Sequence, residues 1–173
     1  MTSDLGVLRR VRLGAVAVAI ALAAACSAAA APPKVGAPAP AMVVRTLDGQ
    51  TLDLAALRGK LVAVNVWATW CAPCRAEMPM LDTFYRQHRD AGFVLVGLSA
   101  DRSRDIGDVR RVMSAFAYPA ALLSQAKVDA LTAPNVLPMT YLVGRDGNVR
   151  AVFGGTAKPL TQADLEAAVS AAM

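Results

Sequence analysis

Two closely spaced cysteines are the residues of this sequence best suited to carry chemistry. Cys71 and Cys74 belong to the run Trp70-Cys71-Ala72-Pro73-Cys74. A structural disulfide usually stabilises a protein by closing a longer loop, and this loop is too short for that purpose. The spacing therefore indicates redox work, in which a thiolate attacks a disulfide sulfur and a second thiol resolves the mixed disulfide.

The residues around the pair predict a strand that leads into a helix. Residues 61–67 are nearly all apolar or β-branched, which is typical of a strand covered on both faces. Residues 74–89 carry apolar side chains at helical spacing. Cys71 would then lie just before the first helical turn, where free backbone N–H groups and the helix dipole stabilise an anion. We therefore expect Cys71 to be the more acidic and more exposed thiol, Cys74 to resolve, and Pro73 to stiffen the loop.

Glu77 follows Cys74 by three residues, on the same side of the predicted helix. Two interpretations of this residue are open. Met78 and Leu81 beside it are apolar, so the carboxyl would be partly buried, would have a raised pKa, and would accept the proton of Cys74. Alternatively, Glu77 is an acidic residue that favours the start of a helix.

Pro138 stands in Leu137-Pro138-Met139-Thr140, directly before a predicted strand. A proline at this point either begins an edge strand or forms a cis peptide bond in a tight turn. The residues by themselves do not decide between these two structures.

The rest of the chain predicts a mixed α/β fold that begins between residues 35 and 41. A buried strand after the long helix implies a right-handed parallel crossover. Turn residues 47–49 and 145–147 each join the two strands of a hairpin. The predicted strands are 42–46, 50–52, 61–67, 93–99, 120–123, 139–144 and 148–153, and the predicted helical segments are 54–57, 74–89, 105–116 and 162–171, the last with Thr161 as its N-cap.

The first residues have the pattern of an export signal. Arg9, Arg10 and Arg12 precede an apolar stretch at 13–25, and small residues follow. This pattern predicts that the protein leaves the cytoplasm.

The end of the signal resembles a bacterial lipobox in which Cys26 becomes the lipidated first residue. The residues concerned are 22–26, although Ala23 stands where a larger aliphatic residue is usual. Cleavage after residues 29–31 and an uncleaved membrane anchor are the two alternatives. A lipid on Cys26 would leave Cys71 and Cys74 as the only cysteine pair of the mature protein.

The composition fits one domain of ordinary charge. The chain has 173 residues, of which 55% are hydrophobic, and a formal charge of +5. Without residues 1–26 that charge is +3, and the remaining Lys and Arg are spread along the chain, which argues against nucleic-acid binding. We therefore predict a signal peptide at 1–26, an Ala/Pro-rich tether at 27–34 and a single domain at 35–173.

The cysteine segment resembles the TlpA/ResA-like branch of the thioredoxin superfamily. The similarity extends to Leu47-Asp48-Gly49, to residues 57–60 and to residues 137–147, and covers nearly the whole chain from Val35 onward. It implies a thioredoxin-like fold, with a central mixed β-sheet flanked by helices and an added N-terminal β-hairpin. The segment that carries the resemblance is Asn65-Val66-Trp67-Ala68-Thr69-Trp70-Cys71-Ala72-Pro73-Cys74-Arg75-Ala76-Glu77-Met78-Pro79.

The resemblance also implies roles for individual residues. Cys71 is the nucleophile, Cys74 the resolving thiol of a redox-active disulfide, and Glu77 a buried acid. Pro138 is a cis proline that faces the disulfide, and the backbone of Leu137 beside it pairs with an extended substrate segment. The residues expected to contact substrate are Trp70, Ala72, Pro73, Leu137 and Pro138.

One position is typical of this branch of the superfamily, and two others depart from the pattern of the family. Asn65 stands where ordinary thioredoxins place a buried Asp, which shifts proton handling towards Glu77. Met139 replaces a small or β-branched residue, and Gly144 stands where many relatives have Asp. Because both lie close to the expected substrate groove, they leave the substrate preference open.

The function implied by the resemblance is that of an exported reductase. It would act, without cofactor or metal, on disulfides of exported proteins such as apocytochromes c or copper-site proteins. Its electrons would come from a membrane thiol transporter, and it would be a monomer tethered on the periplasmic side of the envelope. The alternatives are a thiol oxidase or isomerase, a carrier that binds Cu(I) through the same two thiolates, and a peroxidase on the same fold. We expect the single histidine, His88, to be a solvated residue rather than a metal ligand.

Overall fold

The computed structural model describes residues 33–128, 136–155 and 160–172. The predicted signal peptide, Cys26 and most of the predicted tether lie outside these residues. Within the described ranges no helix combines the length and the apolar character that crossing a membrane requires.

Strands and helices alternate along the first half of the domain, and a hairpin and a helix close it. The strands are β1 Met42–Arg45, β2 Thr51–Asp53, β3 Leu61–Trp67, β4 Phe93–Ser99, β5 Ala120–Leu122, β6 Lys127–Val128, β7 Met139–Val143 and β8 Val149–Gly154. The helices are α1 Ala72–His88, α2 Ile106–Met113 and α3 Gln162–Ala172, and the 3-10 turns are Leu54–Leu57, Arg89–Ala91, Ser103–Asp105 and Leu123–Gln125.

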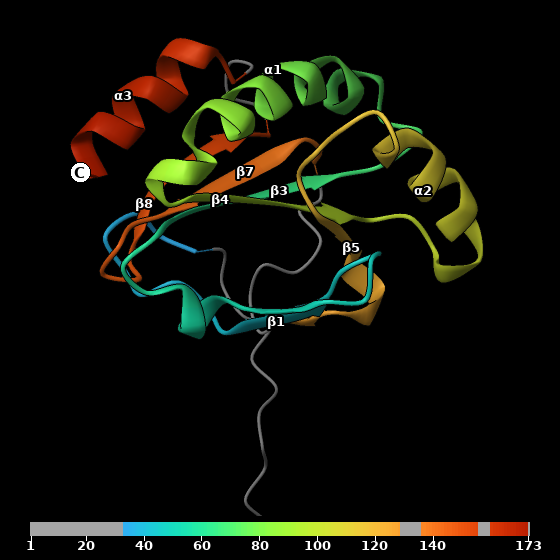
Figure 1. Cartoon of the computed structure of the whole chain (residues 1–173), viewed down its shortest axis with the longest axis horizontal. Helices are drawn as coiled ribbons and strands as arrows, with labels where there is room; N and C mark the ends of the chain where they lie inside the picture. The colour runs from blue at the N-terminus through green and yellow to red at the C-terminus, as the bar shows by residue number, and fades with distance from the viewer. Residues whose placement is uncertain (1–32, 129–135, 156–159, 173) are drawn as a thin grey trace, which may run out of the picture.

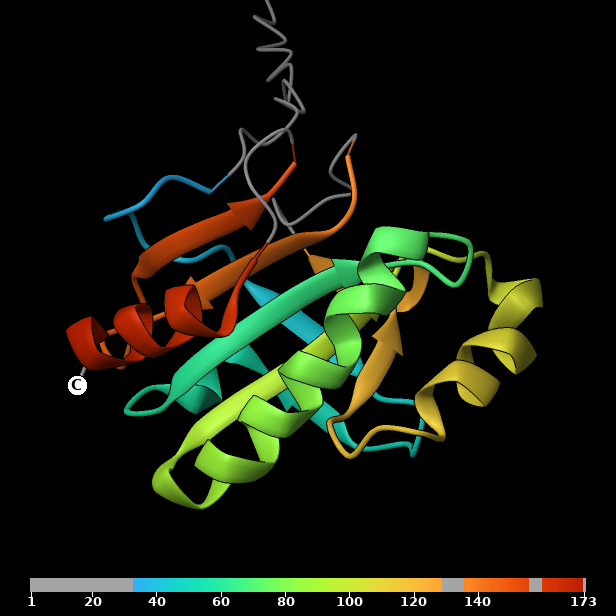
Figure 2. The ribbon, with the colours of Figure 1, turned by 90° about the horizontal axis from the view of Figure 1, so that it is seen from above.

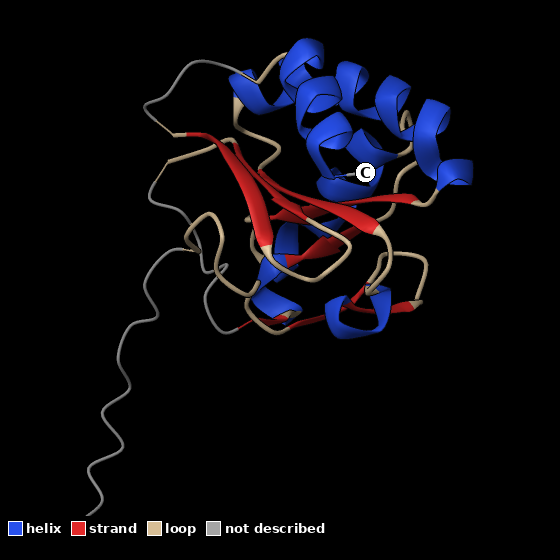
Figure 3. Cartoon of the chain, turned by 90° about the vertical axis from the view of Figure 1, so that its left-hand side faces the viewer, coloured by secondary structure: helices blue, strands red, loops and turns tan. Residues whose placement is uncertain are grey.

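These elements form three layers with a five-stranded sheet in the middle. Helices α1 and α3 cover one face of that sheet, and the strands around β1 lie against the other face (Figure 1, Figure 3). Seen from the helical side, α1 crosses β3 and β4 while α3 lies towards β8 (Figure 2). Helix α2 flanks the edge strand β5 (Figure 1).

Strand β3 is the centre of the molecule. The order of the large sheet is β5-β4-β3-β7-β8, with β3 parallel to β4 and antiparallel to β7. All seven residues of β3 are buried, as the continuous apolar run predicted. The carboxyl ends of β3 and β4 meet at one edge of the sheet, and the start of β7 lies at the same edge, because Met139 pairs with Val66.

The side chains on the two faces of β3 pack into two separate hydrophobic cores. Val62, Val64 and Val66 point towards the small sheet β2-β1-β6 and belong to the core beneath it. Ala63 and Trp67 belong to the core under the helices, which also contains both cysteines of the redox motif. Since side chains alternate along a strand, Asn65 lies on this helical face as well.

The elements predicted around the cysteines are confirmed, as are both hairpins and the Thr161 cap. The prediction for α2 was too long at both ends, because the expected helix 105–116 begins at Ile106 and ends at Met113. After Met113 the N–H groups of Ala115 and Phe116 bond three residues back, and the N–H of Ala117 donates to Asp82 Oδ1 (2.6 Å). This contact with α1 draws the chain out of the helix.

Strand β6 was not predicted. It has two residues, and it pairs with β1 through Val128 opposite Met42 and Lys127 opposite Val43. So short a segment has no periodicity of its own, and only its partner strand defines it.

Candidate active site

The redox loop, residues 68–71, connects the carboxyl end of β3 to the first turn of α1. Cys71 is the N-cap of the helix, with extended backbone angles of φ −87° and ψ 99°. Its N–H donates to the carbonyl of Ala68 and its carbonyl accepts from the N–H of Arg75, each at 3.1 Å. Pro73 in the first turn costs no hydrogen bond, because the first N–H groups of a helix have no partner within it.

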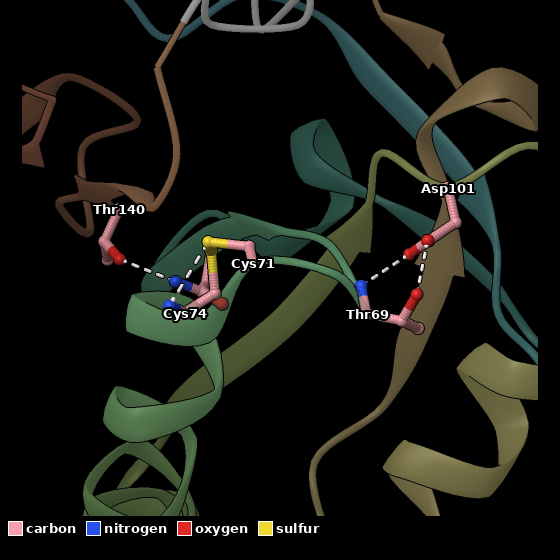
Figure 4. The surroundings of a disulfide bond; sticks show 6 residues. Thr69, Cys71, Cys74, Asp101 and Thr140 are labelled. Carbon is pink, nitrogen blue, oxygen red and sulfur yellow. Dashed lines mark hydrogen bonds between the residues drawn. A yellow bond between two sulfur atoms is a disulfide. The ribbon is translucent and has the colours of Figure 1, made fainter.

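Cys71 and Cys74 form a disulfide, with their Cα atoms 5.3 Å apart (Figure 4). The backbone N–H of Cys74 also donates to Cys71 Sγ, at 3.3 Å. Once the disulfide is reduced, the same N–H and the helix dipole would stabilise a thiolate at Cys71. Cys71 is 6% exposed and Cys74 2% exposed, so the predicted order of exposure holds, although both are largely covered in the oxidised state.

The surface beside the disulfide is formed by Trp70, Ala72 and Pro73, all three of which are exposed. Trp70 is 71% exposed, which is unusual for so large an apolar side chain and suits a contact with a partner. Trp67, three residues earlier, is fully buried and fills the core, as predicted.

Glu77 lies half-buried, one helical turn after Cys74. Its Oε1 accepts a hydrogen bond from the N–H of Leu160, at 3.3 Å. Burial raises the pKa of Glu77, and the Leu160 N–H opposes that rise because it stabilises the carboxylate. The raised pKa agrees with the first of the two interpretations of this residue.

The Leu137–Pro138 peptide bond is cis, as the resemblance implied. Pro138 directly precedes β7, so it lies at the same edge of the sheet as the redox loop. Its carbonyl accepts from the N–H of Gly155, at 3.2 Å. Leu137 packs against both cores, and its backbone groups make no hydrogen bond to another described residue.

A buried polar pair lies under the start of α1. Asn65 is 1% exposed and Thr140 1% exposed, and they face each other across β3 and β7. Asn65 Nδ2 donates to Thr140 Oγ1, at 2.9 Å, close to the disulfide (Figure 4). Asn65 Oδ1 has no hydrogen-bond partner among the described residues.

Two residues of the site were missed from the sequence, Thr69 in the redox loop and Asp101 after β4. Asp101 accepts hydrogen bonds from Thr69 (Figure 4) and from Ser99, and both Asp101 and Ser99 are buried. A signal existed, because an acid follows a buried parallel strand at the edge where the neighbouring strand leads into the cysteine segment.

The described residues contain no cluster of three or more His, Cys, Asp or Glu side chains that could hold a metal ion. His88 is partly buried rather than fully solvated, because its ring packs on Phe84 with ring centroids 4.2 Å apart. Cys26 lies outside the described part of the chain.

Known proteins are similar to this chain in sequence and in fold. A family model described as the AhpC/TSA family matches residues 35–152. The thiol-disulfide oxidoreductase ResA of Bacillus thuringiensis is 33% identical over 118 residues, which is 67% of each chain. The ResA of Geobacillus kaustophilus is 32% identical over 138 residues, or 76% of this chain and 74% of that protein.

A solved structure from Chlorobium tepidum gives the same result for the fold. It is described as a thiol:disulfide interchange protein of the thioredoxin family, and it is 26% identical with a TM-score of 0.66. The match covers 82% of this chain and 99% of that one.

Proposed function

Because the chain belongs to the AhpC/TSA family and is a thiol-disulfide oxidoreductase similar to ResA, we propose that it reduces disulfides in exported proteins. Apocytochromes c and proteins with copper sites are the proposed substrates. The observation that carries the proposal is the Cys71–Cys74 disulfide at the start of α1, at the same sheet edge as the cis bond before Pro138. In this proposal Cys71 is the nucleophile and the segment at Pro138 is the edge to which the substrate binds.

The exchange proceeds in two steps, starting from the reduced enzyme. The Cys71 thiolate attacks one sulfur of a substrate disulfide, that S–S bond breaks, and the released substrate thiolate takes up a proton. Cys74 then loses its proton and attacks Cys71 Sγ, which releases the second substrate thiolate and forms the Cys71–Cys74 disulfide. The substrate gains two electrons and two protons, and a dithiol of a membrane transporter restores the enzyme.

Glu77 is the proposed acceptor of the Cys74 proton. Its carboxyl lies one turn further along α1, and burial raises its pKa towards the range in which a carboxylate takes a proton from a thiol effectively. Asn65 lies on the sheet under the helix but has no charge, so it does not replace the carboxylate.

Substrate binding is assigned to the surface on either side of the disulfide. The backbone groups of Leu137 make no hydrogen bond to another described residue, and they are suited to pair with an extended substrate segment, as a strand added to the sheet edge. Trp70, Ala72 and Pro73 would cover the substrate from the other side. Met139 directly follows Pro138 and would contribute to the choice of substrate.

The proposed location is the periplasmic side of the cell envelope. It rests on the basic and apolar pattern of residues 1–26, with Cys26 as the lipid-bearing residue. The domain would act there as a monomer.

A trapping experiment tests the proposal. The full chain with Cys74→Ser, expressed in its own host, should retain substrates as mixed disulfides on Cys71, because the resolving thiol is missing. The double variant Cys71→Ser/Cys74→Ser is the control and should retain none. Exported proteins with cysteine pairs are the expected partners, whereas no trapped partner together with no insulin reduction by the wild type would refute the enzyme activity.

The direction of exchange needs a second measurement. Cells quenched in acid and treated with an alkylating reagent should show the wild-type pair mainly as thiols. A mainly oxidised pair would instead indicate a thiol oxidase. Tight Cu(I) binding that requires both thiols, without any trapped partner, would favour the carrier.

A further inference from the structure

Asp101 is a buried carboxylate that the exchange steps do not use. It is 4% exposed and lies two residues after the end of β4. None of the ion pairs among the described residues includes it. Burying a carboxylate is costly unless hydrogen bonds compensate for the lost water, so its neighbours should explain why it is there.

All of the side-chain contacts of Asp101 are to hydrogen-bond donors. Oδ1 accepts from Thr69 Oγ1 at 2.6 Å, and Oδ2 accepts from the Thr69 N–H at 2.9 Å and from Ser99 Oγ at 2.6 Å. Figure 4 shows both carboxylate oxygens turned towards Thr69. Two of the three contacts thus go to a single residue of the redox loop, 32 residues away in the sequence.

The loop after β4 holds the redox loop at a second point. The N–H of Ala100 donates to the carbonyl of Trp67, at 2.8 Å, where β3 ends. Thr69 is fixed by Asp101, and Trp70 and Cys71 follow directly. The segment that carries the nucleophile is therefore held from β4 on one side and by the first turn of α1 on the other.

We propose that Asp101 is a positioning residue that holds Cys71 and Trp70 in the orientation needed for attack on a disulfide. In the oxidised protein the Cys71–Cys74 bond itself fixes the loop. In the reduced protein that bond is absent, and the hydrogen bonds of Asp101 keep the redox loop in place while Cys71 attacks. Sulfur exchange is sensitive to this geometry, since a misplacement of about 1 Å can slow an enzyme about 100-fold.

Thr69 and Ser99 provide a matched pair of variants. Thr69→Val keeps the shape of the side chain but removes the hydroxyl that Asp101 Oδ1 accepts from. Ser99→Ala removes the hydroxyl that contacts Oδ2, but Ser99 belongs to β4, and among the described residues its hydroxyl forms hydrogen bonds with Asp101 alone. Both residues contact the same carboxylate, so a role limited to the stability of the fold predicts similar effects of the two variants.

The test uses the reduced full chain and a generic disulfide, insulin, so it does not depend on the natural substrate or on the direction of exchange in the cell. Thr69→Val should lower kcat/KM about tenfold, Thr69→Ser should recover most of the loss, and Ser99→Ala should stay within about twofold of the wild type. Thermal unfolding monitors the fold of each variant. Equal kcat/KM losses in Thr69→Val and Ser99→Ala, or no loss in Thr69→Val, would overturn the proposal.

A second readout separates positioning from stability. The equilibrium between the Cys71–Cys74 disulfide and glutathione depends on how well the two thiols face each other. Thr69→Val should shift this equilibrium towards the dithiol by a few-fold, whereas Ser99→Ala should not. Asp101→Asn is an additional variant. Its shift of this equilibrium should lie between those of Thr69→Val and Ser99→Ala, because its amide retains one acceptor oxygen.

Discussion

Glu77 and Cys74 are one helical turn apart, but their surroundings differ. Cys74 is 2% exposed and lies in the core, whereas the carboxyl of Glu77 lies half-buried next to Leu160. Burial therefore raises the pKa of Glu77 without removing it from solvent, and the Leu160 N–H limits that rise. A carboxyl of this kind can take a proton from the inner thiol and pass it on to water.

The first prediction concerns Glu77→Gln and the rate of exchange. At pH values above its raised pKa, Glu77 is a carboxylate that accepts the Cys74 proton, and glutamine cannot do so. We expect insulin reduction to slow by about tenfold or more near neutral pH. In the wild type the rate should rise with pH as Glu77 and Cys71 each lose a proton. In Glu77→Gln only the rise caused by formation of the Cys71 thiolate should remain. Glu166→Gln on α3 is the control, since that exposed residue lies outside the site, and an unchanged pH profile for Glu77→Gln would remove its acid-base role.

Glu77→Gln should slow the exchange, but it should stabilise the fold relative to the wild type as the pH rises. The pKa of Glu77 is higher in the folded than in the unfolded chain, so the folded protein binds this proton more tightly. Its contribution to stability is fully present below the unfolded pKa and is lost as the pH rises through the folded pKa. Glutamine has no such dependence. As the pH rises from the unfolded pKa through the raised folded pKa of Glu77, the Tm of the wild type should therefore fall relative to that of Glu77→Gln.

At the scale of elements, the cis-proline loop depends on the end of β8. Gly154 has a φ of +101°, and a Cβ there would stand 2.0 Å from the carbonyl oxygen of Pro138. Gly155 donates to that same carbonyl. The close approach of β8 fixes Pro138 from the side away from β3, since β7 lies between the two strands.

Gly154→Ala should therefore disturb both the fold and the docking edge. The strain at this backbone conformation costs about 1–3 kcal/mol, and the steric clash with the Pro138 carbonyl adds to it. We expect a lower urea midpoint and slower exchange with protein substrates. Gly107→Ala in α2 is the control, because a Cβ there meets nothing within 4 Å and alanine favours a helix by up to about 1 kcal/mol. A Gly154→Ala protein as stable as the wild type would contradict this account.

The elements that the sequence predicted are those with their own pattern. β3 has an unbroken apolar run, α1 has apolar residues at helical spacing, and both hairpins have a turn glycine between their strands. The prediction for the end of α2 was wrong because this end depends on a contact with α1, in which the Ala117 N–H donates to the carboxylate of Asp82. β6 was missed because its pairing with β1 defines it.

The same distinction applies to the site. Cys71, Cys74 and Glu77 stand within one short motif, so their spacing predicts how they lie on the helix. Asp101 reaches Thr69 across 32 residues, and Gly154 meets Pro138 across the β7–β8 hairpin. Contacts of this kind join residues that are far apart in the sequence, so the spacing of residues within a motif does not identify the partners.

At the scale of the whole molecule, the residues of the proposed exchange site lie at one edge of the large sheet. At that edge β3 and β4 end and β7 begins. The cysteines, Asp101 and the cis proline therefore lie at the same edge. The first described residues are attached elsewhere, since the Gly36 N–H donates to Val149 and the Ala39 N–H donates to Gly147 at the β7–β8 turn. A tether that precedes them would leave the exchange edge free.

The predicted tether also limits where the enzyme acts. Residues 27–34 span at most about 28 Å when fully extended, so a lipid on Cys26 would keep the domain close to the membrane surface. Substrates and electron donor would then have to meet the exchange edge within that distance. Whether Cys26 carries lipid therefore decides which proteins the cysteine pair can reach.

Metabolic labelling with palmitate, compared between the wild type and Cys26→Ala, tests this prediction. We expect label in the wild type only, and release of Cys26→Ala from the membrane fraction or retention of its uncleaved signal, because the lipid anchor must be attached to the Cys26 sulfur. An unlabelled, soluble wild type would indicate cleavage after residues 29–31, and an unlabelled, membrane-bound wild type of full mass would indicate an uncleaved anchor. Insulin reduction should be equal in both proteins, since Cys26 takes no part in the exchange, and a difference there would show that the leader cysteine interferes with the pair at Cys71 and Cys74.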